Sequence, residues 1–240
     1  MVCRYVDEDY AVTQNRELVG KDISMLYSVI KELFNISEAN GFTEDEIAQV
    51  KSLHGKIPFA LELYYREVGR DEKINHTQNN LIIPWKYSWP KSESHLIIYA
   101  ENQGVCFWGV SLDDLNKDDP PIYVTFDNVV KAKWECETNK LSDFMIAMAH
   151  IHAAFALPFC SEDMFFITKS DLDVIRNHFI KKCESLTQWV DGGAEFFGNH
   201  VCDSIVTMRN GNEYDLYYGS GNKENFGTMD KILSELGSPY

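Results

Sequence analysis

Apolar and polar positions near the start of the chain alternate in a pattern that predicts three amphipathic helices. In "KDISMLYSVIKELF", residues 21–34, apolar side chains recur at steps of three and four, which places them on one helical face. A second helix is expected to begin at Thr43, where Glu46 completes a capping box. A third is expected in "IPFALELYYREVG", with Pro58 in its first turn and Gly69 at its end.

Short apolar runs in the middle of the chain predict strands. Leu96 to Ala100 and Val105 to Val110 flank a glycine-bearing turn, which indicates a hairpin. These runs lack polar alternation, so we expect both faces of the hairpin to be covered. The stretches "IYVTF" and "KAKWECE" predict further strands, and "LSDFMIAMAHIHAAFA" predicts a helix with one apolar face that closes this part.

The remaining chain, from Pro158 on, predicts a helix, a hairpin and a last helix. Ser170 is expected to cap the helix "SDLDVIRNHFIKKCESL", Asn210-Gly211 suits a type I′ turn, and Gly237 can end "TMDKILSEL". The sequence therefore predicts an α+β protein, with N-terminal helices packed on a mainly antiparallel sheet and a C-terminal helix-hairpin-helix extension. We expect one domain over residues 1–157 and an extension over 158–240 that packs on it or forms a small lobe.

The net charge of the chain limits the kinds of partner that we expect it to bind. The chain has 22 basic and 37 acidic residues and a formal net charge of -15, which opposes binding to nucleic acid or anionic lipid and favours basic partners. Simple solubility is the alternative explanation of the same charge, and on charge alone it is the preferred one. The start "MVCRYVDEDY" lacks the pattern of a secretion signal, and "FMIAMAHIHAAFALPF" is too short and too interrupted for a membrane span. We expect a cytoplasmic protein without a membrane partner.

The sequence contains no pattern that identifies a catalytic, metal-binding or nucleotide-binding site. His150 and His152 lie two positions apart on a helix and point to different sides, so they do not form a metal site. Cys106 lies inside an apolar strand with Trp108, where packing is the expected role of both. Cys160 has no identifiable base, and the glycines of "GSGNKENFG" do not match a nucleotide-binding loop. The sequence predicts no catalytic residue, cofactor or metal.

The order of these elements resembles the SUKH superfamily, which includes bacterial immunity proteins of polymorphic toxin systems and fungal cell-wall assembly regulators. The resemblance covers roughly residues 20–157 and is carried by "IPFALELYYREVG", "LIIYAENQGVCFWGV", "DPPIYV" and "LSDFMIAMAHIHAAF". The matching positions are Ile57, Pro58, Phe59, Leu63, Tyr64, Gly69, Glu101, Asn102, Gly104, Trp108, Pro121, Ile122 and Tyr123.

The resemblance implies a non-enzymatic binder that neutralises a toxin inside the cell, such as a nuclease, by covering its surface. An acidic binder suits the basic surface of a nuclease. Aromatic anchors ringed by carboxylates are the candidates for contact; they are Trp85, Tyr87, Trp89, Glu101, Asp113, Asp114, Asp118 and Asp119. Core packing of the aromatics and solvation of the acids are the alternatives. Two other functions stay open, a regulatory or scaffold module and an enzyme with a dispersed site.

Overall fold

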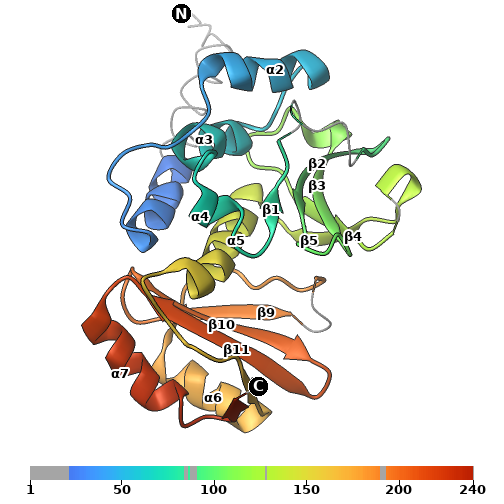
Figure 1. The fold of residues 1–240 in the computed structure, drawn as a ribbon. Coiled ribbons are helices and arrows are strands. Elements are labelled where there is room, and N and C mark those ends of the chain that lie inside the picture. The colour runs from blue at the N-terminus through green and yellow to red at the C-terminus, as the bar shows by residue number, and fades with distance from the viewer. Residues whose placement is uncertain (1–21, 84–85, 87–90, 128, 190–192, 240) are drawn as a thin grey trace, which may run out of the picture.

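Two antiparallel sheets lie on either side of a long helix in the computed structural model (Figure 1). The structure describes residues 22–83, 86, 91–127, 129–189 and 193–239. Helices and strands are both well represented, and the α+β class predicted from the sequence is confirmed.

The predicted N-terminal helices are present. The first covers residues 22–33, and the next ones are α2 (Glu44–His54), α3 (Phe59–Val68) and the short α4 (Glu72–Asn75). The predicted capping box begins α2, where the backbone N–H of Thr43 donates to Oε2 of Glu46 over 2.8 Å. Gly69 is the C-cap residue of α3, as predicted, and its N–H donates the final i→i−4 hydrogen bond to the carbonyl oxygen of Tyr65.

The first sheet follows these helices and has its strands in chain order. They are β1 (Asn80–Leu81), β2 (His95–Ala100), β3 (Phe107–Ser111), β4 (Ile122–Thr125) and β5 (Glu135–Thr138). The 3-10 helices η1 (Leu112–Asp114) and η2 (Val129–Lys131) lie in the connections. The predicted hairpin is β2 and β3, and the side chains of Cys106 and Trp108 are fully buried in its core.

The helix α5 (Leu141–Ala156) lies between the two sheets and is buried almost all round. The sequence predicted a single apolar face. Instead, its side chains join one core that contains Trp108 of the first sheet and Phe196 and Val206 of the second. A helix with apolar residues on every side is stable when both sides are covered by protein. Within the described ranges, no helix combines the length and apolar content needed to cross a bilayer.

The second sheet is built by the C-terminal part of the chain. Its strands are β6 (Phe159–Cys160), β7 (Phe165–Ile167), β8 (Ile180–Lys181), β9 (Ala194–Gly198), β10 (Asp203–Asn210), β11 (Glu213–Ser220) and β12 (Ser238–Pro239). The helices α6 (Lys169–His178) and α7 (Lys223–Leu233) cover the face away from α5 (Figure 1). The extension therefore contains more strand than the predicted helix-hairpin-helix.

Two local predictions in this part were wrong. The helix α6 is capped by Thr168 and not by Ser170, and it ends at His178 because the next residues pair with β9 as strand β8. In the hairpin of β10 and β11, Asn210 pairs with Glu213, so Gly211 takes the first central position of the turn with φ 61°. A turn with glycine at that position fits the type II′ class better than the predicted type I′.

A buried carboxylate connects the first sheet to the loop between β8 and β9 of the second sheet. Glu137 on β5 has 4% of its surface exposed, and its oxygens accept hydrogen bonds from three consecutive backbone N–H groups. The donors are Thr187, Gln188 and Trp189, at 2.6, 2.9 and 3.0 Å. The indole N–H of Trp108 also donates to Glu137, over 3.4 Å. Carboxylates are seldom buried unless they are satisfied in this way.

Candidate functional site

The structure separates the predicted contact residues. Trp85, Tyr87 and Trp89 lie outside the described residues. Glu101 follows β2 at one end of the hairpin, whereas the acidic loop, residues 112–119, begins where β3 ends. The strand β3 runs between them, so the acids do not form one continuous surface.

Glu101 stabilises the turn in which it lies. Its Oε2 accepts the backbone N–H of Gln103 over 2.7 Å and that of Val105 over 3.4 Å. Gly104 has φ 72°, the left-handed region that glycine adopts without strain. These bonds give the glutamate-to-glycine turn a local structural basis.

Asp119 supports the start of α5. Its two carboxylate oxygens accept the backbone N–H of Ser142 over 2.8 Å and the hydroxyl of Ser142 over 2.6 Å. The N-cap residue of α5, Lys140, contributes no side-chain hydrogen bond. The carboxylate of Asp119 therefore satisfies a helix N–H that has no partner inside the helix.

The other three acids of the loop are Asp113, Asp114 and Asp118. Asp113 is exposed, and Asp114 forms an ion pair with Lys117 at 2.8 Å, which raises the pKa of the lysine. The carbonyl oxygen of Asp118 accepts the backbone N–H of Ala60 over 2.9 Å, which fixes the loop against the first turn of α3. Of these three acids, Asp118 thus contacts α3, whereas Asp113 and Asp114 lie in η1 earlier in the same loop.

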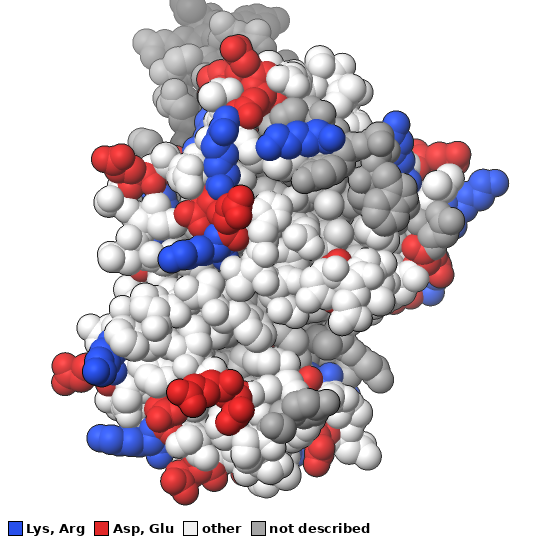
Figure 2. Space-filling view, in the orientation of Figure 1, with Lys and Arg blue, Asp and Glu red and all other residues white. Residues whose placement is uncertain are grey.

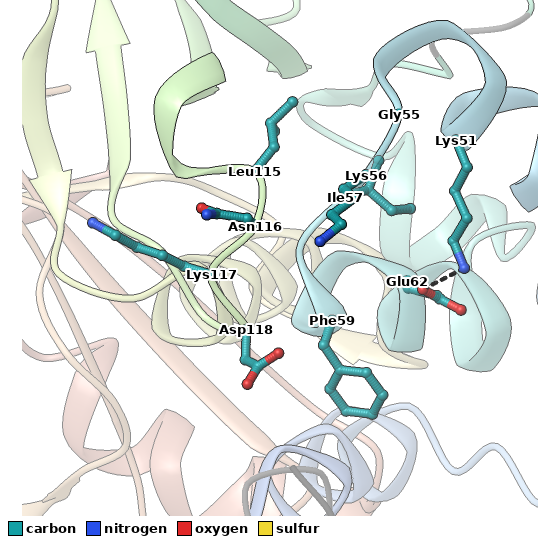
Figure 3. A pocket seen from close by; sticks show the side chains of 10 residues that line it. All are labelled: Lys51, Gly55, Lys56, Ile57, Phe59, Glu62, Leu115, Asn116, Lys117 and Asp118. Atoms are coloured by element: carbon teal, nitrogen blue, oxygen red, sulfur yellow. Dashed lines mark ion pairs between the residues drawn. The ribbon is translucent and has the colours of Figure 1, made fainter. Parts of the chain in front are cut away.

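A surface hollow of about 380 Å³ lies between this loop and the connection from α2 to α3 (Figure 3). One wall is formed by residues 115–118 and the other by residues 55–57, with Lys51 of α2 and with Phe59 and Glu62 of α3. Its apolar side chains are Ile57, Phe59 and Leu115, of which Ile57 and Leu115 are buried and Phe59 is half-buried. The lining is therefore apolar at its base and charged along its walls.

Ion pairs occupy most of the charges around the hollow. Lys51 pairs with Glu62 at 2.7 Å, and Glu62 also pairs with Arg66 at 2.6 Å. Arg66 reaches Glu44 in turn at 2.6 Å, which lowers the pKa of that carboxyl group. Figure 2 shows acidic and basic side chains close together over the helical part of the molecule. Exposed pairs of this kind contribute little stability.

Cys106 is buried in the core, and His150 and His152 face different surroundings, as the sequence predicted. Burial raises the pKa of the Cys106 thiol far above its usual range, so the reactive thiolate is disfavoured. His150 contacts Ser204 and His152 accepts the N–H of Thr77, which puts the two rings in different surroundings. Burial lowers the pKa of each to about 3. In the described part of the chain, no three His, Cys, Asp or Glu side chains are grouped to hold a metal ion.

Sequence reasoning missed the hollow and the role of Glu137. The stretch "KIPF" indicates the start of α3, but it does not reveal that Lys56, Ile57 and Phe59 line the hollow. The signal for Glu137 was an acid in the strand stretch "KAKWECE", where alternation alone does not tell buried from exposed acids. Comparison of the chain with protein-family models, curated proteins and solved structures found no match.

Proposed function

We propose that this chain is a non-enzymatic protein-binding module, and that it acts as an immunity protein which neutralises a toxin inside the cell by covering its surface. One observation carries the proposal: the acidic loop forms a wall of a hollow with an apolar base. Apolar centres with polar or charged rims are typical of protein interfaces. The resemblance to the SUKH superfamily supports the same class of function.

Charge supports a basic partner. The net charge of -15 would attract a basic toxin over long range, and exposed acids such as Asp113 would act at its approach. The apolar base formed by Ile57, Phe59 and Leu115 would then provide the anchoring contact. In this proposal Asp119 is left out of the contact surface, because its carboxylate is engaged by Ser142.

Co-expression with the product of a neighbouring toxin-like gene tests the function. We expect the chain to restore growth and to co-purify with the toxin. Failure of both, with the chain folded, would refute the proposal. Co-purification without restored growth would instead favour a regulatory module.

Charge reversal tests the surface. The variant Asp113→Lys/Asp114→Lys should slow association with the toxin by about ten-fold at low salt and weaken its salt dependence. The matched control is Glu213→Lys/Glu235→Lys, which makes the same change in charge at exposed positions of the C-terminal part. Binding kinetics at two salt concentrations compare the variants. Equal effects of both variants would mean that net charge, and not the acidic loop, directs association.

A further inference from the structure

We infer that the hollow beside the acidic loop receives a glutamate or aspartate side chain of the partner, together with a neighbouring apolar side chain. This inference rests on the proposed function and names the chemistry that the same site recognises. The partner would thus present a negative side chain at this one place, although the negative net charge of the whole chain attracts positive groups.

The local charge of the hollow carries the inference. Among the described residues that line it are three lysines, Lys51, Lys56 and Lys117, and two acids, Glu62 and Asp118. These lining residues have a formal charge of +1 within a chain of net charge -15, and Lys51 and Lys117 are held in ion pairs with Glu62 and Asp114. A partner group that approaches Lys56 therefore meets a positive charge at short range, although the whole protein is negative at a distance.

Ion pairing leaves one lysine available. Lys51 is held by Glu62 at 2.7 Å, and Lys117 by Asp114 at 2.8 Å. Lys56 is exposed and forms no ion pair with any residue that the structure describes. In Figure 3 the ammonium group of Lys56 is turned toward the space between the two walls, while that of Lys117 points away. The ammonium of Lys56 is thus placed to pair with an incoming carboxylate.

The apolar side chains of the hollow indicate which kind of partner side chain lies next to the carboxylate. Ile57 and Leu115 keep only 7% and 6% of their surface exposed, and Phe59 adds an aromatic ring at the lower edge of the hollow. A volume of about 380 Å³ accommodates a few side chains rather than a whole helix. An acidic residue next to a leucine or phenylalanine, in one loop of the partner, matches both features.

Capped peptides test this chemistry without the toxin. Acetyl-Gly-Leu-Glu-Phe-Gly-amide, titrated into the ¹⁵N-labelled full chain, should shift the amide signals of Lys56, Ile57, Leu115 and Asn116. The peptide with glutamine in place of glutamate should bind about five-fold more weakly, the size expected for one exposed ion pair. The variant Lys56→Gln should lose this preference, whereas Lys231→Gln, which removes an exposed lysine of α7, should keep it.

The inference is overturned if both peptides bind equally, if the shifts lie outside the hollow, or if Lys56→Gln retains the preference. Restored growth in co-expression is scored separately for the same variants. Loss of growth rescue by the Asp113→Lys/Asp114→Lys variant, with no peptide preference, would refute the carboxylate inference and leave the proposed function standing. Peptide preference without any growth rescue by the unaltered chain would refute the toxin function and support the chemistry of the hollow.

Discussion

Replacing Glu137 by alanine is expected to destabilise the protein more than the loss of Asp119 or of an exposed acid. The carboxylate lies on β5 of the first sheet and binds the backbone of residues 187–189, fifty or more positions later in the chain. Removing it leaves three N–H donors and the indole of Trp108 without their acceptor. The loop between β8 and β9 of the second sheet then loses its attachment to β5.

The magnitude follows from the bonds and their exposure. Hydrogen bonds to a charged group contribute about 1.5–3 kcal/mol each to stability. Thr187 and Gln188 are exposed, so water can replace the carboxylate at their N–H groups, whereas Trp189 is half-buried. We expect Glu137→Ala to lower the free energy of unfolding by about 3–5 kcal/mol. Glu137→Gln keeps one acceptor oxygen and should cost about 1–2 kcal/mol.

Urea unfolding followed by circular dichroism and by tryptophan fluorescence measures this loss. The matched control is Glu135→Ala on the same strand, because Glu135 is exposed and pairs only at the surface with Lys133 at 2.6 Å. It should change stability by about 0.5 kcal/mol or less. A loss below about 1 kcal/mol for Glu137→Ala, or one equal to that of the control, would show that the buried carboxylate does not hold the two sheets together.

Three further predictions concern the helix start, pH and thiols. Asp119→Ala should lower stability by about 1–2 kcal/mol in thermal unfolding, because Ser142 loses its acceptor, whereas Asp113→Ala should have little effect; equal effects would contradict the capping role. Burial lowers the pKa of His150 and His152 to about 3 in the folded protein. Between about pH 6.5 and pH 3, these two side chains therefore bind protons in the unfolded chain but not in the folded one. Stability should therefore fall as the pH drops from about 6.5 to about 3, by up to about 1.4 kcal/mol per pH unit for each histidine. His150→Gln should reduce this slope between pH 7 and pH 5, and an unchanged slope would refute the assignment. Iodoacetamide should modify the exposed Cys136 before the buried Cys106, as mass spectrometry of peptides would show, and the reverse order would mean that the core opens readily.

The sequence by itself determined the elements whose signals are local. The spacing of apolar residues located the N-terminal helices and the hairpin of β2 and β3, and the pair Thr43 and Glu46 located the start of α2. It also placed Cys106 and Trp108 in the core, because a short run of apolar residues between turn residues is typical of a covered strand. Such signals depend on contacts within one helical turn or one hairpin, and the chain sequence contains them directly.

Only the tertiary structure decided which distant residues meet. It placed α5 between two sheets. It also brought the carboxylate of Glu137 within hydrogen-bond distance of the backbone of residues 187–189, and that of Asp119 within hydrogen-bond distance of Ser142. It also put Glu101 and the acidic loop at opposite ends of β3 and brought Lys56 to the same hollow as Asp118. From pattern and composition alone, every acidic residue is predicted to lie on the solvated surface, whatever its position in the chain. Whether its carboxylate faces water, a helix end or a partner depends on how the elements pack, and packing is set by contacts across the whole chain.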